Sequence, residues 1–278
     1  LAARALLPPR GAWGRAGSMV MLPALGWSSL HDQTHTVLVT AVTAGTWWAL
    51  IGLVQSPRPA RYALLGFMLG LGMLSKYNFA LCAATLGLAA LSVPATRAVL
   101  LARGLWITAA VALALVLPHA LWLADHWLAT AVAITDKLEV RPAGGRIDGL
   151  GELLVTLLAT LLLWTLLAAW AFRGAWLRAL SAGAAPSTPA APWAKPLLAR
   201  YLAGVLAVFV GMVLFGHVTE FKEHWLQPLF CVWPLAAFVW RPQLESAPGG
   251  RRFTGAVLGV ALLFFLATAA YPWVAGWR

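Results

Sequence analysis

A lysine interrupts what would otherwise be one long apolar stretch in the first third of this chain. Fourteen nearly apolar residues, 62–75, run into Lys76, Tyr77 and Asn78, and a second apolar run follows at once. A lysine at the centre of a membrane-spanning helix costs roughly 2.5–3.5 kcal/mol on insertion scales. Two arrangements therefore remain open: Lys76 lies deep in one long helix and has a partner, or the chain surfaces at a tight polar turn.

The composition indicates an integral membrane protein. Of the 278 residues, 61% are hydrophobic and 10% are charged, whereas soluble domains carry about 25% charged residues. Long apolar runs separated by short basic loops are typical of helical bundles, because a β-barrel shows short alternating segments instead. The net charge of +11 does not indicate a nucleic-acid partner, since the basic residues fall between the apolar runs, where the positive-inside rule expects them.

The apolar runs predict an all-α fold, a polytopic transmembrane helical bundle with about eight spans in this chain. Residues 1–18 predict an irregular segment, and residues 19–278 predict one partial transmembrane domain whose N-terminal spans are absent. A partial segment at 19–27 precedes the spans. The expected spans are 35–55, 62–75, 79–95, 104–123, 151–171, 200–217, 225–240 and 253–275.

Small residues inside the spans support two further predictions. The pairs Gly66/Gly70 and Gly255/Gly259 have the small-xxx-small spacing that permits close helix packing. The two cysteines lie inside apolar runs, at positions 82 and 231. We interpret them as small buried hydrophobic residues, which indicate nothing about the redox compartment.

The distribution of charge decides between the two arrangements at Lys76. If the chain turns there, so that 62–75 and 79–95 form a hairpin, eleven basic residues and one acid fall on one side of the membrane. The other side then collects six basic residues and eight of the nine acids. One continuous helix would invert every later loop and scatter the basic residues over both sides. The positive-inside rule therefore favours the hairpin, with the arginine-rich loops in the cytoplasm.

The hairpin arrangement places all six histidines at or near the non-cytoplasmic rim of the bundle. Two of them flank an acid in the segment His31-Asp32-Gln33-Thr34-His35. A carboxylate between two imidazoles could act as a base, orient a histidine or contribute to a metal site. The alternative is a solvated helix start, in which Asp32 complements the positive end of the helix dipole.

The turn itself is the second polar cluster on this rim. A lysine held at the membrane interface, as predicted for Lys76 beside Tyr77 and Asn78, is a point-charge partner suited to a phosphate. The alternative is a snorkelling interfacial lysine with an aromatic neighbour from the interfacial belt.

Two more clusters complete the predicted rim. Lys222 and His224 are suited to an anion or a sugar, with Trp225 as a flat stacking face; the alternative is an ordinary loop anchored by an interfacial tryptophan. His119 lies one turn into a span, where a polar side chain is least expected, and therefore indicates a cavity. Asp125 and His126, which follow in the same cluster, are equally well explained as plain loop residues.

Four motifs in this order resemble the membrane glycosyltransferases of family 39 and their relatives. These are the dolichyl-phosphate-mannose protein mannosyltransferase-like and lipid A aminoarabinose transferase-like enzymes of the GT-C class. The motifs are residues 22–27 (Leu-Pro-Ala-Leu-Gly-Trp) with 31–36 (His-Asp-Gln-Thr-His-Thr), 70–78 (Gly-Leu-Gly-Met-Leu-Ser-Lys-Tyr-Asn), 118–123 (Pro-His-Ala-Leu-Trp-Leu) and 222–228 (Lys-Glu-His-Trp-Leu-Gln-Pro).

The resemblance implies transfer of a sugar from a polyprenyl phosphate at the extracytoplasmic membrane surface. It implies that Asp32 is the second-loop aspartate near the active site, that Lys76 faces the donor phosphate, and that Lys222 and His224 form a basic pair before a span. Some relatives hold a divalent metal, to which His119 or His224 would contribute here. The candidate substrate-binding residues are His31, His35, Lys76, Tyr77, Asn78, Lys222, His224 and Trp225, and Asp32 is the candidate catalytic residue.

The family's principal catalytic carboxylate lies in an Asp-Glu pair of the first outer loop. This chain contains no such pair, so we expect the pair to lie in a missing N-terminal part and the chain to be inactive alone. The expected partners are a polyprenyl-phosphate-linked sugar donor, a glycan, lipid or protein acceptor, and the bilayer. The expected location is the bacterial inner membrane, with the site facing the periplasm.

Two other classes of function compete with this interpretation. A secondary transporter or a flippase of lipid-linked sugars keeps ionisable residues near the bilayer midplane and often shows internal repeats. The chain shows no convincing repeat, and its polar residues line one rim, which favours an enzyme. A non-catalytic membrane scaffold is the third class. Walker, Cys-x-x-Cys, His-Glu-x-x-His and nucleophile-elbow motifs are absent from the sequence.

Overall fold

The computed structural model describes residues 18–22, 35–128, 145–174, 191–241, 244 and 249–275. All regular elements within these ranges are helical, which confirms the predicted all-α class. They are η1 (Ser18–Met21), α4 (His35–Gln55), α5 (Pro59–Ser75), α6 (Phe79–Ser92), α7 (Pro94–Leu100), α8 (Leu105–Asp125), α10 (Arg146–Ala171), α12 (Ala194–Leu214), α13 (Glu223–Phe230), α14 (Trp233–Trp240) and α15 (Gly250–Ala275).

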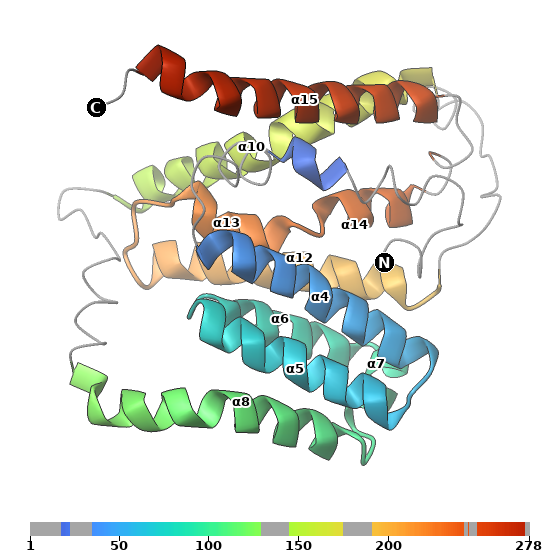
Figure 1. The fold of residues 1–278 in the computed structure, drawn as a ribbon, viewed down its shortest axis with the longest axis vertical. Helices are drawn as coiled ribbons and strands as arrows, with labels where there is room; N and C mark the ends of the chain where they lie inside the picture. The colour runs from blue at the N-terminus through green and yellow to red at the C-terminus, as the bar shows by residue number, and fades with distance from the viewer. Residues whose placement is uncertain are drawn as a thin grey trace.

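The helices lie side by side in a bundle whose outermost members are α8 and α15 (Figure 1). In the most apolar stretch of each helix, the buried share is only 6% for α8 and 11% for α15, whereas it is 56% for α4. Large leucines such as Leu113 and Leu121 on α8 are well exposed. Lipid tails are as apolar as leucine, so these outer faces suit contact with a bilayer and the core lies around α4 and α12.

Helices cover each of the eight predicted spans, although two of these spans are bent or broken, and residues 23–27 of the partial segment lie outside the described ranges. The count of about eight spans stays a prediction. Five described helices, α4, α8, α10, α12 and α15, are long and apolar enough to cross a membrane. The number rises to six if α6 and α7 form one bent span. At 17 and 14 residues, α5 and α6 fall short of the ~20 residues that a full span needs.

Glycines let α5 pack closely on α8, as the first small-xxx-small pair predicted. A Cβ atom at Gly66 would lie 2.4 Å from the backbone oxygen of Thr108, and one at Gly70 would lie 2.9 Å from the side chain of Leu115. The Thr108 hydroxyl also donates a hydrogen bond across the interface to the Tyr62 carbonyl, at 2.8 Å. The prediction for the second pair was wrong, because no atom of the described residues lies within 4 Å of a Cβ built at either of its glycines, on the exposed helix α15.

The predicted span 79–95 is a shorter helix followed by a sharp bend. Between α6 and α7 the chain turns by 113°, because Pro94 disfavours helical geometry at Val93 and has no N–H to continue the hydrogen-bond ladder. Val93 has extended backbone angles. The buried Thr96 hydroxyl then donates to the Ala90 carbonyl at 2.5 Å, which fixes the bend.

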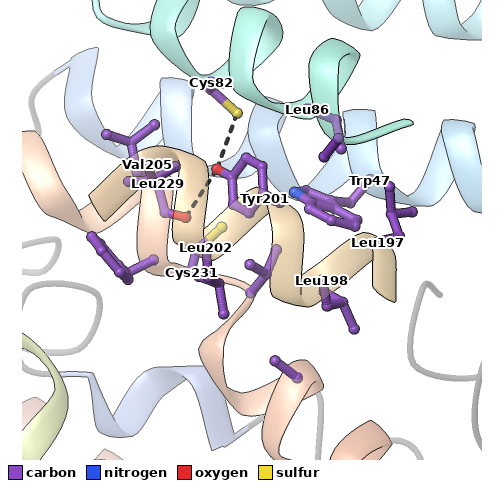
Figure 2. Packing of buried hydrophobic residues seen from close by; sticks show 14 of the residues in the cluster. Trp47, Cys82, Leu86, Leu197, Leu198, Tyr201, Leu202, Val205, Leu229 and Cys231 are labelled. Atoms are coloured by element: carbon purple, nitrogen blue, oxygen red, sulfur yellow. Dashed lines mark hydrogen bonds between the residues drawn. The ribbon is translucent and has the colours of Figure 1, made fainter. Parts of the chain in front are cut away.

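The predicted single span 225–240 was also wrong, because α13 and α14 are two short helices. Pro234 cannot donate to Phe230 and its ring clashes with a helical carbonyl four residues earlier. The break exposes the carbonyl of Leu229 inside the core, where Tyr201 of α12 donates a hydrogen bond to it at 3.0 Å (Figure 2). Tyr201 is fully buried and packs edge-on against Trp47, with ring centroids 5.0 Å apart.

Both cysteines lie in this same core, as predicted. Cys82 of α6 and Cys231 after α13 are free and buried, and Figure 2 shows them on either side of the Tyr201 ring. The Cys82 sulfur lies 3.5 Å from the Tyr201 hydroxyl oxygen. The two thiols therefore fill space in the core, and the Cys82 thiol also contacts one buried hydroxyl.

The helix ends gather at two opposite edges of the bundle (Figure 1). At the right-hand edge, which we call the arginine edge, α4, α6 and α14 end and α5, α8 and α15 begin. There Arg61 donates to the Gly52 carbonyl, and Arg200 donates to Ser92. At the left-hand edge, which we call the tip edge, α4, α6, α10 and α13 begin and α5, α8 and α12 end. This grouping agrees with the predicted partition of the loops; which edge faces the cytoplasm stays a prediction.

Candidate functional site

The chain makes a tight turn at Lys76, Tyr77 and Asn78, as the hairpin arrangement predicted. Helix α5 ends at Ser75, and its capping residue Lys76 has extended backbone angles. The N–H of Phe79 donates to the Lys76 carbonyl at 3.0 Å and starts α6 directly. The two helices contact each other, so one continuous helix over 62–95 is excluded and the turn forms the tip of an α5–α6 hairpin.

The lysine of the turn points to the beginning of α4. Its Nζ atom donates a hydrogen bond to the hydroxyl oxygen of Thr36, at 3.0 Å. Thr36 is buried and is the second residue of α4. The ammonium group of Lys76 therefore lies beside the first turn of a helix, where backbone N–H groups without helical partners carry partial positive charge.

The tyrosine of the turn begins a column of aromatic rings on α8. The Tyr77 hydroxyl lies 3.2 Å from Nε2 of His119, and their rings are stacked with centroids 6.0 Å apart. His119 stacks on Trp122 at 5.8 Å, and Trp122 stacks on His126 at 4.4 Å. His126 also uses Nδ1 to donate a hydrogen bond to the Trp122 carbonyl, at 2.9 Å.

This column lies on a part of α8 that extends past the hairpin tip. His119 meets the tip, and α8 continues for six more residues to Asp125, or roughly 9 Å at 1.5 Å per residue. Trp122 is 51% exposed and Tyr77 43%. The end of α8 therefore presents aromatic and imidazole groups next to the turn that contains Lys76. One of these groups, His119, was predicted to indicate a cavity.

Asn78 has a different environment from the other two residues of the turn. Both amide atoms of its side chain are inaccessible to solvent, and neither has a hydrogen-bond partner among the residues that the structure describes. A buried polar group without a partner costs about 1–3 kcal/mol, and such a group in a folded protein calls for an explanation. The role of Asn78 in substrate binding stays a prediction.

The third predicted cluster begins α13. Lys222 is the capping residue of this helix, and both Lys222 and His224 are exposed. The His224 ring meets Trp225 edge to face, with centroids 6.2 Å apart, and Trp225 is half-buried. Helix α13 packs against α4, so this cluster shares the tip edge with the Lys76 turn (Figure 1).

The remaining predicted residues lie outside what the structure describes. His31 and Asp32 are outside the described ranges, and for His35 the structure describes only the backbone, at the start of α4. Over the described parts of the chain, no three His, Cys, Asp or Glu side chains come together as a metal site. The proposed metal ligands His119 and His224 thus stay untested.

Sequence reasoning missed two features of this site. Thr36 was not singled out, because a threonine in the first turn of an apolar helix has many structural explanations. The stack from Tyr77 to His119 joins residues 42 positions apart, and no local pattern predicts it. The spacing of His119, Trp122 and His126 along one helix could have indicated the rest of the column.

The sequence matches known proteins over most of its length. Residues 1–122 match the family model described as dolichyl-phosphate-mannose-protein mannosyltransferase. The chain is 32% identical over 245 residues to the lipopolysaccharide core galacturonosyltransferase RgtA of Rhizobium johnstonii, an alignment that covers 85% of this chain and 47% of RgtA. It is 31% identical over 224 residues to the lipopolysaccharide core galacturonosyltransferase RgtB of the same organism, over 78% of this chain and 43% of RgtB.

The chain thus spans less than half the length of these curated relatives. No solved structure is significantly similar to it. The family match covers the turn at Lys76 and the column on α8 as far as Trp122, and the bundle has the apolar helices of a membrane protein. Residues 1–122 are thus similar to the dolichyl-phosphate-mannose-protein mannosyltransferase family, and most of the chain is similar to part of two glycosyltransferase sequences, RgtA and RgtB.

Proposed function

We propose that this chain acts in a membrane glycosyltransferase and binds a sugar carried on a polyprenyl phosphate. The observation that carries the proposal is the position of Lys76, whose ammonium group is held at the tip of an apolar hairpin, beside the N-terminal end of α4. Both the ammonium and the helix end favour a negative group. A lipid-linked phosphate that enters sideways from the bilayer would meet them where the helices end.

The proposed chemistry is displacement at the anomeric carbon of the sugar. A hydroxyl oxygen of the acceptor forms a bond to this carbon, and the bond from the carbon to the phosphate oxygen breaks with its electron pair. The leaving polyprenyl phosphate gains one negative charge, which Lys76 would stabilise most in the transition state. The hydroxyl proton passes to a carboxylate base. Asp32 is this chain's candidate, and the family's Asp-Glu pair would be the principal one.

The relatives suggest the first substrates to test. RgtA and RgtB are named for galacturonosyl transfer to the lipopolysaccharide core, so we propose galacturonate on a polyprenyl phosphate as donor and a lipopolysaccharide core as acceptor. The proposed location is the bacterial inner membrane, with the tip edge toward the periplasm, because this partition leaves the arginine edge in the cytoplasm.

The test compares two lysines in membranes that contain the full gene product. Lys76→Met should lower kcat about 10²–10³-fold, as loss of one transition-state donor does, and Lys76→Arg should keep part of the activity. Lys195→Met is the matched control, because Lys195 is exposed at the arginine edge, and it should have no effect. The product is measured by mass spectrometry of the acceptor.

Two results would contradict the proposal. Equal activity of the Lys76→Met and Lys195→Met proteins would remove Lys76 from the reaction. Movement of the lipid-linked sugar across the membrane without any new glycosidic bond would indicate a flippase instead of a transferase.

A further inference from the structure

The beginnings of α5 and α8 meet the short helix α7 at one corner of the arginine edge (Figure 1). The buried side chain of Tyr62, on α5, joins them. Its hydroxyl donates a hydrogen bond to the Val99 carbonyl of α7 at 2.9 Å, and a Cβ atom at Gly104, the capping residue of α8, would clash with its ring. Three segments are thus fixed against one side chain, and we call residues 58–62 and 97–106 the Tyr62 corner.

Three exposed arginines belong to this corner. Arg58 caps α5, and its carbonyl accepts a hydrogen bond from the N–H of Tyr62 at 3.2 Å. Arg97 and Arg103 lie within two residues of the positions that contact the Tyr62 side chain. No acidic residue occurs in the sequence from 33 to 124, so no carboxylate near these arginines in the sequence offsets their charge.

Two large apolar side chains lie beside the arginines. Trp106 is 79% exposed and Leu101 is 70% exposed. Trp106 shares one face of α8 with Leu113 and Leu117, which lie about two and three turns further along the helix and are also exposed. This face suits contact with lipid tails, and Trp106 lies at its end, in the first turn of α8. Because tryptophan favours the boundary between lipid tails and headgroups, the Tyr62 corner lies at the level of the headgroups.

We infer that the Tyr62 corner binds the headgroup of an anionic phospholipid. Its three arginines would donate to the phosphate oxygens, which suit the planar fork of a guanidinium group, and Trp106 and Leu101 would contact the upper part of the acyl chains. A zwitterionic phospholipid offers the same phosphate, but its own ammonium group offsets the negative charge, so the arginines favour the anionic lipid. The corner lies at the opposite edge from the Lys76 turn, so the inference is independent of the proposed donor site.

The test measures the affinity for the first bound lipid, by native mass spectrometry of the full gene product in detergent. Dioleoyl phosphatidylglycerol is compared with dioleoyl phosphatidylcholine, which has the same acyl chains and no net charge. The wild type should bind phosphatidylglycerol at least about tenfold more tightly. Arg58→Gln, Arg97→Gln and Arg103→Gln should each weaken this binding about fivefold, the effect of one arginine near an anionic headgroup, and should leave phosphatidylcholine binding unchanged.

Arg251→Gln is the matched control. Arg251 is also exposed and lies in the first turn of α15, at the arginine edge, but α15 and α8 are the outermost helices on opposite sides of the bundle (Figure 1). The substitution removes the same charge outside the corner and should change neither affinity, because salt screens exposed charges over such a separation. Arg103→Lys keeps the charge without the fork and should lose less affinity than Arg103→Gln.

Equal affinity of the wild type for the two lipids would overturn the inference. A loss in Arg251→Gln as large as in the corner variants would also overturn it, because the attraction would then belong to the whole edge. Inorganic phosphate, added at constant ionic strength, should not displace the lipid; displacement would assign the corner to a soluble anion instead. Should one corner variant misfold, the other two test the same site, and unchanged phosphatidylglycerol binding in both would contradict it.

Discussion

Replacing Gly66 by alanine should push α5 away from α8 and destabilise the bundle. The added Cβ would lie 2.4 Å from the Thr108 carbonyl oxygen and 3.0 Å from its Cα atom, whereas ordinary contact begins at 3.4 Å. The obstructing atoms belong to the backbone of a helix and cannot rotate aside. The two helices must therefore separate by about 1 Å, the shortfall from ordinary carbon–oxygen contact.

The energy of this change has three parts. Overpacking of a close interface costs about 1–3 kcal/mol. The separation also weakens the hydrogen bond from Thr108 to the Tyr62 carbonyl, which contributes about 0.5–1.5 kcal/mol. The higher helix propensity of alanine offsets up to about 1 kcal/mol of this destabilisation. The net expectation is a loss of about 1–3 kcal/mol in the free energy of unfolding.

Gly87→Ala is the matched control for this prediction. Gly87 lies inside the neighbouring helix α6, and within the described parts of the chain no atom lies within 4 Å of a Cβ built there. This variant gains only the propensity term and should be as stable as the wild type or more stable by up to about 1 kcal/mol. Thermal unfolding of the purified protein in detergent, followed by tryptophan fluorescence, compares them. Equal midpoints for Gly66→Ala and Gly87→Ala would refute the packing of α5 against α8.

Three further substitutions test the core, the turn and a loop. Tyr201→Phe leaves the buried Leu229 carbonyl unpaired and should cost about 1–3 kcal/mol of unfolding free energy, measured by the same unfolding assay; an unchanged midpoint would contradict it. Tyr77→Phe removes the hydroxyl that contacts His119. It should weaken undecaprenyl phosphate binding severalfold with little effect on stability, because the pair is exposed. Unchanged affinity would show that the aromatic column takes no part in binding the phosphate. His217 has a φ of 53°, so replacement by glycine should raise stability by about 0.5–1 kcal/mol; a lower midpoint would show that the imidazole stabilises the loop after α12.

Much of the fold could be predicted from the sequence because apolar runs and polar interruptions are local signals. The polar residues at 76–78 predicted the hairpin, and the structure ends α5 and begins α6 there. The spacing of Gly66 and Gly70 predicted a close helix contact, which α8 provides. These predictions were correct since the physical cause lies within a few residues of its effect.

The errors came from proline and from exposure. Pro94 and Pro234 lie inside apolar runs, and both runs were predicted as unbroken spans. The structure bends or breaks them beside each proline, because hydropathy does not register a missing N–H. The pair Gly255/Gly259 has the same spacing as Gly66/Gly70, yet α15 is an outer helix, and no described part of the chain packs on that side of it. Spacing alone does not state which helix faces the lipid.

The site was predicted less completely than the fold. Residue type and a position at a helix end were enough to single out Lys76 and Tyr77. Their partners, Thr36 and His119, lie 40 and 42 residues away, and only the packing of α5 with α4 and α8 brings them together. A long-range contact of this kind depends on the tertiary arrangement of several helices, which no single stretch of sequence specifies.

The proposed function requires the Lys76 turn to face the outside of the cell, and cysteine labelling measures this directly. Tyr77 and Arg103 are both exposed, at the tip edge and the arginine edge. Each is replaced by cysteine in a protein whose buried native thiols, Cys82 and Cys231, are changed to alanine. A membrane-impermeant maleimide should label position 77 in intact spheroplasts, and position 103 only after lysis. Labelling of position 103 in intact spheroplasts, with position 77 protected until lysis, would contradict the proposed orientation.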